Sequence, residues 1–392
     1  MHISNIRLKK IRTFEDIELN LTNGIHLITG NNASGKTNLL ESMHYLATTK
    51  SIQNRNDKNF ISWEAMQESA LPIGKISAHI NTLDKTHEID MMFSKPIKET
   101  IANDNEPSGK ITKNFRLNGI TKKASEIIGT LRAIYASPND MQIILGTPAE
   151  RRKYLDILIS QYSKKYLKSL QKYNRIIRQR NSLLKQIKHI KKRYDELDYW
   201  DSELAIAASE IINLRSENIN QLSARAKFHY EILDNKNKEL KISYKPALPQ
   251  AFDATELIQI DKDYFIDILQ KNRTVDLRQS STIFGPHRDD INIDLDELAA
   301  NAFGSRGQQK LITICMRLAE AHLSNQVTKD QPILLLDDIL SEFDEEHRNY
   351  IVEHAANVEQ VFLTSPDLSN VPKKLIDRSI QFNINDGSIK KN

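Results

Sequence analysis

The sequence predicts an α/β protein whose parallel sheet is interrupted by a long α-helical insert. Three observations favour this fold class. Short apolar segments with strand-like alternation occupy residues 1–36, apolar residues recur at helical spacing over much of 148–275, and strand-like runs return at 332–336 and 360–364. We therefore expect the N-terminal part of a head domain at 1–147, a helical arm at 148–275, and the C-terminal part of the head at 276–392.

The composition is that of a globular protein. The 392 residues suffice for two or three domains, and a hydrophobic fraction of 39% can supply a core for each. The single cysteine, Cys315, excludes an internal disulfide framework, and the sequence shows neither a secretory signal nor an apolar run of membrane-spanning length. We expect a cytoplasmic protein without a membrane partner. The net charge of +4 does not by itself indicate a nucleic-acid partner.

The first elements are predicted to be three strands and a helix. Alternating apolar residues at 3–8 and 17–21 and the run 25–29 indicate the strands. The stretch 37–45 lacks helix breakers and carries apolar residues at helical spacing, so a helix directly follows the third strand. The region that follows, to about Tyr135, is poorly patterned, and its polar insert 103–109 is expected to be a loop.

The middle of the chain is predicted to form a helical hairpin. After Pro148, apolar residues recur from Leu155 to Leu184 at steps of three, four and seven, which predicts one long helix. A second series with the same heptad step runs from Trp200 to Leu222 after a polar break. Beyond the hairpin we expect short strands at 282–284 and 291–293, a helix over 309–323, and the strands 332–336 and 360–364 that complete the parallel sheet.

Residues 30–37 match the phosphate-binding P-loop pattern completely and lie between a predicted strand and a predicted helix. Glycines allow backbone N–H groups to face a phosphate, Lys36 supplies positive charge to the β and γ phosphates, and the Thr37 hydroxyl can ligate Mg²⁺. The alternative, a glycine turn with a surface lysine, is disfavoured by the strand–helix context. We expect ATP and Mg²⁺ to bind here, through Gly30, Asn31, Asn32, Ala33, Ser34, Gly35, Lys36, Thr37 and the adjoining Asn38.

The run 333–338 is an apolar strand that ends in two carboxylates, which is the form of the motif that partners a P-loop. In isolation such a strand could simply end in a helix cap or a turn. Together with the P-loop, Asp337 is interpreted as the carboxylate on the Mg²⁺ side and Asp338 as the base that orients water. Asp338 and Lys36 are therefore the candidate catalytic residues.

Residues 303–310 open the predicted helix through 309–323 and offer a second anion site. The amides of Gly307 and Gln308 lie at the helix start beside the Ser305 hydroxyl. An ordinary serine N-cap is the alternative for this segment alone. Five of the twelve glycines, however, lie in the segments around 30–35, 285 and 304–307. Two phosphate-binding helix starts in one head favour a dimer in which each protomer caps the nucleotide held by the other.

The motifs, their order and their spacing resemble the ABC/SMC-type ATPases and, within them, the RecF family. The segment 305–309 is similar to the family's signature motif, and 335–344 is similar to its Walker B motif and D-loop. Three further segments resemble RecF sequences: 146–156, 179–185 and 285–290. The resemblance covers the chain from the first strands to about Thr364, except about 53–131 and 229–275. It implies an ABC/SMC-like P-loop ATPase head with an inserted α-helical arm.

The resemblance also assigns individual residues. It implies a signature acting in trans (Ser305, Arg306, Gly307 and Gln308), D-loop residues (Ser341 and Asp344), a nucleotide contact from Arg12, and a metal site of Thr37, Asp337 and Gln142. The segment 9–14 lacks the Asn-Phe-Arg triplet expected around the arginine, and 137–140 does not fix the alignment of Gln142. The histidine of many ABC proteins is absent after the last strand, which leaves Thr364 or Ser365 in its place.

A basic run marks the first helix of the arm. Twelve Lys or Arg residues and no Asp or Glu lie between Lys164 and Arg193. A solvated helix face and a nucleic-acid site are about equally compatible with such a run. Tyr162, Tyr166, Leu170, Tyr173 and Ile177 supply a buried stripe, so the candidates to contact a DNA backbone on the open side are Lys165, Lys168, Lys172, Arg175 and Lys185.

The resemblance implies an ATP-dependent DNA-binding protein of recombinational repair. It implies ATP-driven homodimers that hold duplex DNA near single-stranded gaps, cooperation with RecO and RecR in loading RecA, and a weak, DNA-stimulated ATPase that resets the clamp. Support of replication restart and of the SOS response would follow. Two alternatives stay open: a transporter subunit, which needs no basic arm but requires a membrane partner, and a nucleotide-gated DNA adaptor that does not hydrolyse ATP.

Overall fold

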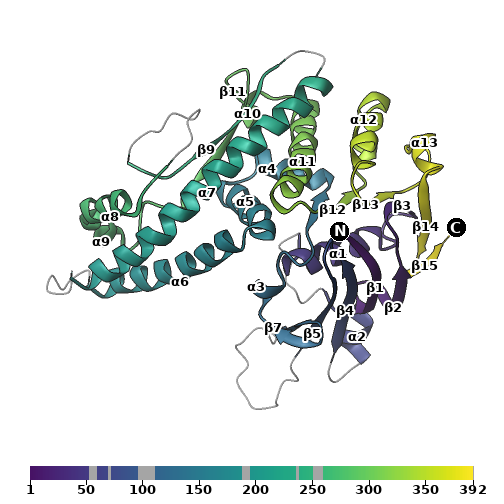
Figure 1. The fold of residues 1–392 in the computed structure, drawn as a ribbon, viewed down its shortest axis with the longest axis horizontal. Helices are drawn as coiled ribbons and strands as arrows, with labels where there is room; N and C mark the ends of the chain where they lie inside the picture. Colours follow the sequence, from purple (N-terminus) through teal and green to yellow (C-terminus); the bar gives the residue numbers. More distant parts are fainter. Residues whose placement is uncertain are drawn as a thin grey trace. The chain divides into compact units, whose positions relative to one another are not determined.

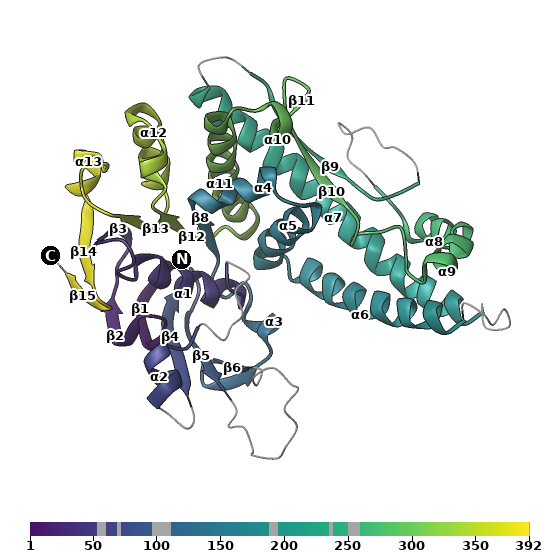
Figure 2. The ribbon, with the colours of Figure 1, turned by 180° about the vertical axis from the view of Figure 1, so that it is seen from behind.

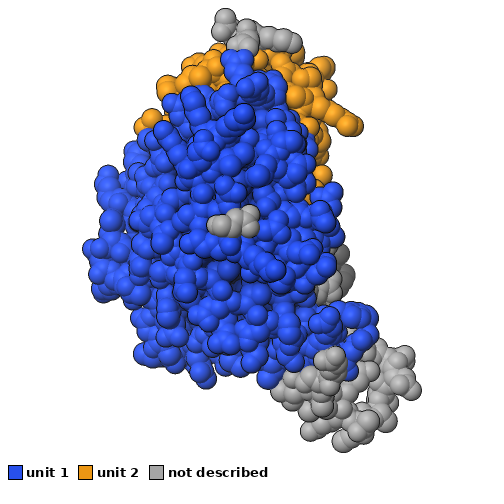
Figure 3. All heavy atoms as spheres, turned by 90° about the vertical axis from the view of Figure 1, so that its right-hand side faces the viewer, with its two compact units in different colours: residues 1–138, 321–392 blue, residues 139–320 orange. Residues whose placement is uncertain are grey.

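The computed structural model describes residues 1–52, 60–68, 72–95, 111–187, 195–234, 238–249 and 259–391. The chain forms two compact units, which Figure 3 colours separately: unit 1 comprises 1–138 and 321–392, and unit 2 comprises 139–320. The expected boundaries lay at 147/148 and 275/276, whereas the units divide at 138/139 and 320/321. The segment 276–320 therefore groups with the helices rather than with the head. The predicted loop at 103–109 lies outside the described residues.

The described residues of unit 1 form two six-stranded sheets. The first has the order β2-β1-β4-β5-β6-β7 and is antiparallel throughout. It is built from β1 (His2–Ile11), β2 (Phe14–Asn20), β4 (Ile73–Asn81), β5 (Thr86–Ser94), β6 (Thr112–Leu117) and β7 (Ile120–Lys122). The two predicted N-terminal strands are thus confirmed, but they belong to this antiparallel sheet.

The second sheet of unit 1 carries the phosphate-binding loop. Its order is β15-β14-β3-β13-β12-β8, and only the β14–β15 pair is antiparallel. Its strands are β3 (Gly24–Thr29), β8 (Ala133–Ala136), β12 (Ile333–Asp337), β13 (Gln360–Ser365), β14 (Ser379–Asn385) and β15 (Ser388–Lys391). The predicted strands at 25–29, 332–336 and 360–364 are confirmed. Because β3, β12 and β13 are buried on both faces, they read as continuous apolar runs.

Helix α1 (Lys36–Thr48) follows β3 as predicted, and its apolar side shares one core with both sheets of unit 1. Shorter helices complete the unit: α2 (Trp63–Glu68), α3 (Ala124–Ile127), α12 (Glu345–Ala355) and α13 (Lys373–Ile376). In Figures 1 and 2 the strands of unit 1 run from purple at the N-terminus to yellow at the C-terminus, which shows that segments from both ends of the sequence build it.

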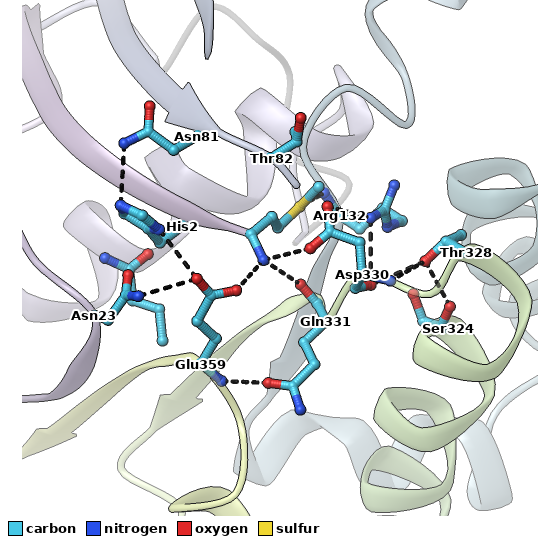
Figure 4. Close-up of polar contacts among 12 residues, drawn as sticks. His2, Asn23, Asn81, Thr82, Arg132, Ser324, Thr328, Asp330, Gln331 and Glu359 are labelled. Atoms are coloured by element: carbon cyan, nitrogen blue, oxygen red, sulfur yellow. Dashed lines mark hydrogen bonds and ion pairs between the residues drawn. The ribbon is translucent and has the colours of Figure 1, made fainter. Parts of the chain in front are cut away.

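Polar contacts join the two sheets at their edge. The side chain of Gln360, which is fully buried, accepts from the Ile3 amide at 2.8 Å and donates to the carbonyl of Ile3 at 2.9 Å. The main-chain nitrogen of Met1 contacts Asp330 at 2.5 Å and also Glu359. Figure 4 shows Glu359, Asp330 and Gln331 converging on this point. Strand β1 is therefore fixed to the starts of β12 and β13.

Unit 2 is mainly helical. It contains α4 (Gln142–Leu145), α5 (Pro148–Tyr162), α6 (Lys164–Ile187), α7 (Asp195–Leu233), α8 (Lys262–Lys271), α9 (Arg273–Gln279) and α10 (Ala300–Phe303), and α11 (Arg306–Thr328) begins in it. Helices α6 and α7 pack side by side, which confirms the predicted hairpin (Figures 1 and 2). No helix of the described residues combines the length and apolar character needed to cross a membrane.

Three details of unit 2 correct the prediction. The expected single helix from 155 to 184 is two helices, because Ser163 adopts an extended conformation and its Oγ accepts from the Tyr166 amide at 3.1 Å, which caps α6. No strand forms at 282–284. The strand near 291–293 is β10 (Asp290–Leu295), which pairs antiparallel with β9 (Leu240–Lys245) and β11 (Leu298–Ala299) and not with the parallel sheet.

The three RecF-like segments all take part in polar contacts within unit 2, and 146–156 and 285–290 contact each other directly. Arg151 binds both carboxylate oxygens of Asp290, at 2.6 and 2.9 Å. The buried Arg215 contacts Asp289 at 3.0 Å and Asp156 at 2.8 Å. Farther along α6, Arg180 is fully buried and pairs with Asp201 and Asp276, each at 2.6 Å. These segments therefore have a structural function in holding the helices of unit 2 together.

Candidate functional site

The phosphate-binding loop depends on two glycines. Gly30 has a φ of +150°, and a Cβ there would lie 2.2 Å from the carbonyl oxygen of Ile384 on β14. Gly35 has a φ of +116°, and a Cβ there would lie 2.7 Å from the Thr13 hydroxyl. Other residues at these positions would be strained and would collide with neighbouring atoms. The loop conformation is thus fixed by local sequence and by the close approach of β14 and the β1–β2 turn.

Lys36 is held inside this loop. Its ammonium donates to the carbonyls of Gly30 at 2.6 Å and Asn31 at 2.9 Å, and its side chain is largely buried. Burial lowers the pKa of the Lys36 amine, while the nearby Asp338 and Asp337 oppose this shift. Loop carbonyls are weak partners for an ammonium, so a phosphate placed in the loop would be a stronger one. Lys36 is therefore prepositioned for an anion.

The loop also presents polar atoms that fit a phosphate. The Ser34 hydroxyl is buried and has no hydrogen-bond partner among the described residues. Helix α1 begins at Lys36 without a side-chain cap and without an acidic residue in its first turn. Its free N–H groups therefore carry the positive end of the helix dipole toward the loop. The residues present fit the triphosphate of ATP.

Asp337 lies at the carboxyl end of β12 and collects three hydroxyl groups. The Thr37 hydroxyl lies 3.1 Å from Oδ1, the Thr364 hydroxyl lies 2.8 Å from the same oxygen, and the Tyr135 hydroxyl lies 2.7 Å from Oδ2. Hydroxyl and carboxylate oxygens are the ligands that Mg²⁺ prefers, with the rest of its shell supplied by phosphates and water. Thr37 and Asp337 thus fit the metal site expected from the sequence.

Asp338 differs from its neighbour. Its φ of +51° lies in the left-handed region, which is uncommon for a residue other than glycine. Its Oδ1 atom is buried without a hydrogen-bond partner among the described residues, and its amide donates to the Thr364 hydroxyl at 2.9 Å. Burial raises the pKa of the Asp338 carboxyl; the Ser341 hydroxyl opposes this shift and the Asp337 charge adds to it. A carboxylate with an open acceptor and a raised pKa suits the proposed role of orienting water.

Four further residues assigned in unit 1, Arg12, Asn38, Ser341 and Asp344, have partners of their own. Arg12 pairs with the buried Glu41 of α1 at 2.8 Å, and Asn38 donates to the Thr13 hydroxyl at 3.2 Å. Ser341 donates to the carbonyl of Asp338 at 2.8 Å, and Asp344 caps α12 by accepting from the His347 amide. Arg12 therefore braces the helix of the phosphate-binding loop in this structure, and its nucleotide contact stays a prediction.

The signature segment belongs to unit 2. Ser305 precedes α11, where its amide donates to the Gln308 side chain at 2.9 Å and its hydroxyl accepts from the Gln308 amide at 3.3 Å. Ser305, Arg306 and Gly307 are exposed. Gln142, the first residue of α4, is also exposed and in unit 2. The trans role of the signature and the metal contact of Gln142 stay predictions.

The arm divides its basic residues into two sets. Lys165 and Lys172 form ion pairs with Glu210 at 2.9 Å and Glu203 at 2.8 Å, in the antiparallel register of α6 against α7. The other three candidates, Lys168, Arg175 and Lys185, are exposed and follow a line on α6 that also contains the exposed Arg178. Lys165 and Lys172 are thus partly neutralised within the arm.

Of two further residues at the site, the sequence analysis named Thr364 and missed Tyr135. Thr364 was one of two candidates to replace the missing histidine, and the structure places its hydroxyl between Asp337 and the Asp338 amide. Ser365 is buried as well, but no such contact is seen for it among the described residues. Tyr135 was missed, because an apolar strand containing one tyrosine gives no sign of where its hydroxyl points.

Comparison with known proteins agrees with this geometry. Residues 2–382 match the family model described as RecF/RecN/SMC N terminal domain. The "DNA replication and repair protein RecF" of Herpetosiphon aurantiacus is 32% identical over 394 residues, covering 99% of each chain, and that of Streptococcus uberis is 33% identical over 392 residues, covering all of both.

Solved structures show the same relationship. The "recombination mediator protein RecF-ATP in RecFOR pathway" matches with a TM-score of 0.83 and 28% identity, covering 100% of this chain and 97% of that one. An Smc head domain from Pyrococcus furiosus, at 15% identity and a TM-score of 0.52, covers 100% of this chain and 96% of that one and shares the fold alone. With its P-loop, its helical arm and its paired aspartates in this order along the sequence, the chain belongs to the RecF family of ABC/SMC-type ATPases.

Proposed function

We propose that this chain is an ATP-dependent DNA-binding protein of recombinational repair. ATP and Mg²⁺ bind at the phosphate-binding loop, two protomers associate around the nucleotide, and the dimer holds duplex DNA near single-stranded gaps. Slow, DNA-stimulated hydrolysis resets the clamp. The observation that carries this proposal is the signature segment at the start of α11. Its residues Ser305, Arg306 and Gly307 are exposed, so they are accessible to a second protomer.

Gly307 supports an intermolecular role for the signature. A Cβ at Gly307 would have no neighbour closer than the Ser305 hydroxyl at 4.0 Å, so packing within the chain does not require glycine there. The contrast with Gly30 is sharp, since a Cβ there would meet a backbone oxygen at 2.2 Å. A glycine without an internal steric reason is expected where a second molecule approaches the backbone closely. The γ phosphate bound by a partner protomer is such a molecule.

The exposed line on α6 supports contact with a DNA backbone. Lys168, Arg175, Arg178 and Lys185 lie at helical spacing on α6, and the rise from the first to the last is about 26 Å along the helix axis. No acidic residue interrupts α6. If each cation neutralises one phosphate, one arm contributes about 3.6 to the logarithmic salt slope of binding, and two arms contribute about 7. Such contacts bind duplex without reading its sequence.

The partners follow from the relatives. Two solved relatives are described as recombination mediators of the RecFOR pathway. We extend this to cooperation of the present chain with RecR and RecO, and through them with RecA loading, replication restart and the SOS response. The family assignment favours this repair role over the transporter alternative. Phosphate release measured with and without duplex DNA distinguishes a DNA-stimulated ATPase from a non-hydrolysing adaptor.

The central test is a Ser305→Arg variant. It places a bulky cation where the γ phosphate of a partner must approach, while the phosphate-binding loop of each protomer stays intact. Light scattering with ATP and Mg²⁺ should give dimers for the parent and monomers for the variant, although both bind a fluorescent ATP analogue. Ser202→Arg, on the exposed side of α7, adds the same side chain elsewhere and should dimerise normally. Dimers of Ser305→Arg at parental strength would contradict the ATP clamp.

A separate test addresses the arm. Arg175→Ala combined with Arg178→Ala should lower the salt slope of duplex binding by about 1.8 per arm. The control, Lys373→Ala combined with Lys374→Ala, removes the same charge from the exposed side of α13 and should leave the slope unchanged. Equal slopes for the two double variants would mean that the arm does not carry the DNA contacts, even if the clamp itself is correct.

A further inference from the structure

We propose that Tyr135 is a positioning residue for the metal site: its hydroxyl holds the Asp337 carboxylate in the orientation that receives Mg²⁺. This inference rests on the proposed ATP-binding function and adds a residue to it. It assigns a role to a side chain outside the phosphate-binding loop, the aspartate strand and the signature. The argument combines the strand register, the burial of the ring and the number of donors on Asp337.

The strand register brings Tyr135 to Asp337. Strand β8 pairs in parallel with β12, and Tyr135 stands opposite Leu335. Asp337 lies two residues farther along β12, on the same face, at about 6.6 Å along the strand. A tyrosine side chain is long enough to cover that distance, and its hydroxyl lies 2.7 Å from Oδ2. A shorter side chain, or phenylalanine, would bring no donor to this oxygen.

The tyrosine ring is fixed by its surroundings. It is 6% exposed and belongs to the main core of unit 1. It also packs against the His44 ring of α1, with centroids 5.8 Å apart. Helix α1 is the helix that begins at Lys36, so the ring is anchored on the element that carries the phosphate-binding loop. The hydroxyl therefore holds Asp337 in a defined position relative to Thr37.

The number of donors shows what Tyr135 does to the carboxylate. A carboxylate offers about four acceptor positions. Among the described residues, Thr37 and Thr364 both contact Oδ1, while Tyr135 alone contacts Oδ2. The acceptor position left over is therefore on Oδ2, which is the oxygen available to the metal or to a water bound to it. Among the described residues, Tyr135 is the only donor to this oxygen, so removing its hydroxyl leaves Oδ2 of Asp337 without a hydrogen bond.

A positioning role of Tyr135 can be distinguished from a purely structural role, because the two roles predict different effects of removing its hydroxyl. A buried hydrogen bond to a carboxylate stabilises a fold whether or not a metal binds. A positioning role, in contrast, changes the dependence of nucleotide binding on Mg²⁺. Outer contacts that orient a metal ligand commonly change metal affinity by about 10-fold or more. The test must therefore measure metal affinity and not only activity or stability.

The experiment uses the full chain and its Tyr135→Phe variant. Binding of a fluorescent ATP analogue is titrated with MgCl₂, beginning in EDTA. We expect equal affinity for the analogue in EDTA and a Mg²⁺ half-saturation about 10-fold higher in the variant. The matched control is Tyr162→Phe, which removes a hydroxyl hydrogen bond to Asn218 in unit 2 and should not change the Mg²⁺ titration.

Thr364 provides a second, independent pair of variants. Thr364→Ser keeps a hydroxyl beside Asp337, whereas Thr364→Val removes it; the first should titrate with Mg²⁺ like the parent and the second should resemble Tyr135→Phe. A Mg²⁺ half-saturation in Tyr135→Phe equal to or below the parental value would overturn the proposal. If the parent itself shows no Mg²⁺-dependent nucleotide binding, the proposed function fails first, so the two failures are distinguishable.

Discussion

Acidification is expected to destabilise the parallel sheet of unit 1 through His26. This residue lies on β3, is fully buried, and stacks on Phe362 with ring centroids 4.8 Å apart. Neither ring nitrogen has a well-formed hydrogen bond among the described residues, although the backbone at Gly24 and Val361 weakly favours the charged form. Burial lowers the pKa of His26 from 6.5 to about 4.

The sign and size of the effect follow from linkage. Because the unfolded chain binds a proton at His26 more readily than the folded chain, the folded state is favoured above pH 6.5 and loses stability as the pH falls toward about 4. A pKa difference of this size corresponds to about 3 kcal/mol in the free energy of unfolding. Since β3 leads directly into Gly30, loss of this strand also removes the phosphate-binding loop.

The assay compares the parent with His26→Phe, which keeps an aromatic ring but cannot be protonated. Urea unfolding followed by circular dichroism is measured at several values between about pH 7.5 and pH 4, and hydrogen exchange of 24–29 reports on β3 itself. The difference in unfolding free energy between the two proteins should change by about 3 kcal/mol over this range, in favour of the variant at low pH. His287, whose pKa burial also lowers to about 4, is common to both proteins. Parallel pH profiles for the two proteins would refute the reasoning.

Three further predictions concern single residues. Asp338→Asn should keep ATP and Mg²⁺ binding but slow phosphate release and trap the dimer, and a parental rate would show that Asp338 is not the base. Gly30→Ala should abolish nucleotide binding and lower the melting temperature, because position 30 has a positive φ and the added Cβ would collide with a backbone oxygen. A normal melting temperature would contradict this steric argument. Arg180→Met leaves Asp201 and Asp276 buried without this partner and should destabilise the arm by about 3–5 kcal/mol. Hydrogen exchange of α6 measures this loss, and unchanged protection would show that the ion pairs contribute little.

Several features could be predicted because each depends on residues close together in the sequence. The phosphate-binding loop needs eight consecutive residues, and the flanking strand and helix are visible in the same window. Apolar spacing alone was enough to find the hairpin of α6 and α7 and the strands β12 and β13. The same spacing could not detect the break at Ser163, because the apolar residues of the two flanking helices keep the spacing of one continuous helix across it.

Other features were decided by contacts between distant parts of the chain. Tyr135 and Asp337 are 202 residues apart, and Thr364 is 27 residues beyond Asp337, so only the parallel pairing of β8, β12 and β13 brings their oxygens together. The pairing of β10 with β9 likewise joins residues 290–295 to 240–245 within unit 2.

The arm shows the same division between local and tertiary information. The sequence alone determined that α6 is basic and amphipathic. The antiparallel register against α7 decided that Lys165 and Lys172 form ion pairs with glutamates, although Lys165 itself stays exposed, while Lys168 and Arg175 are exposed outside these pairs. The physical reason is that local sequence fixes backbone conformation and apolar periodicity over a few turns, whereas the partner of each charge depends on which distant segment packs beside it.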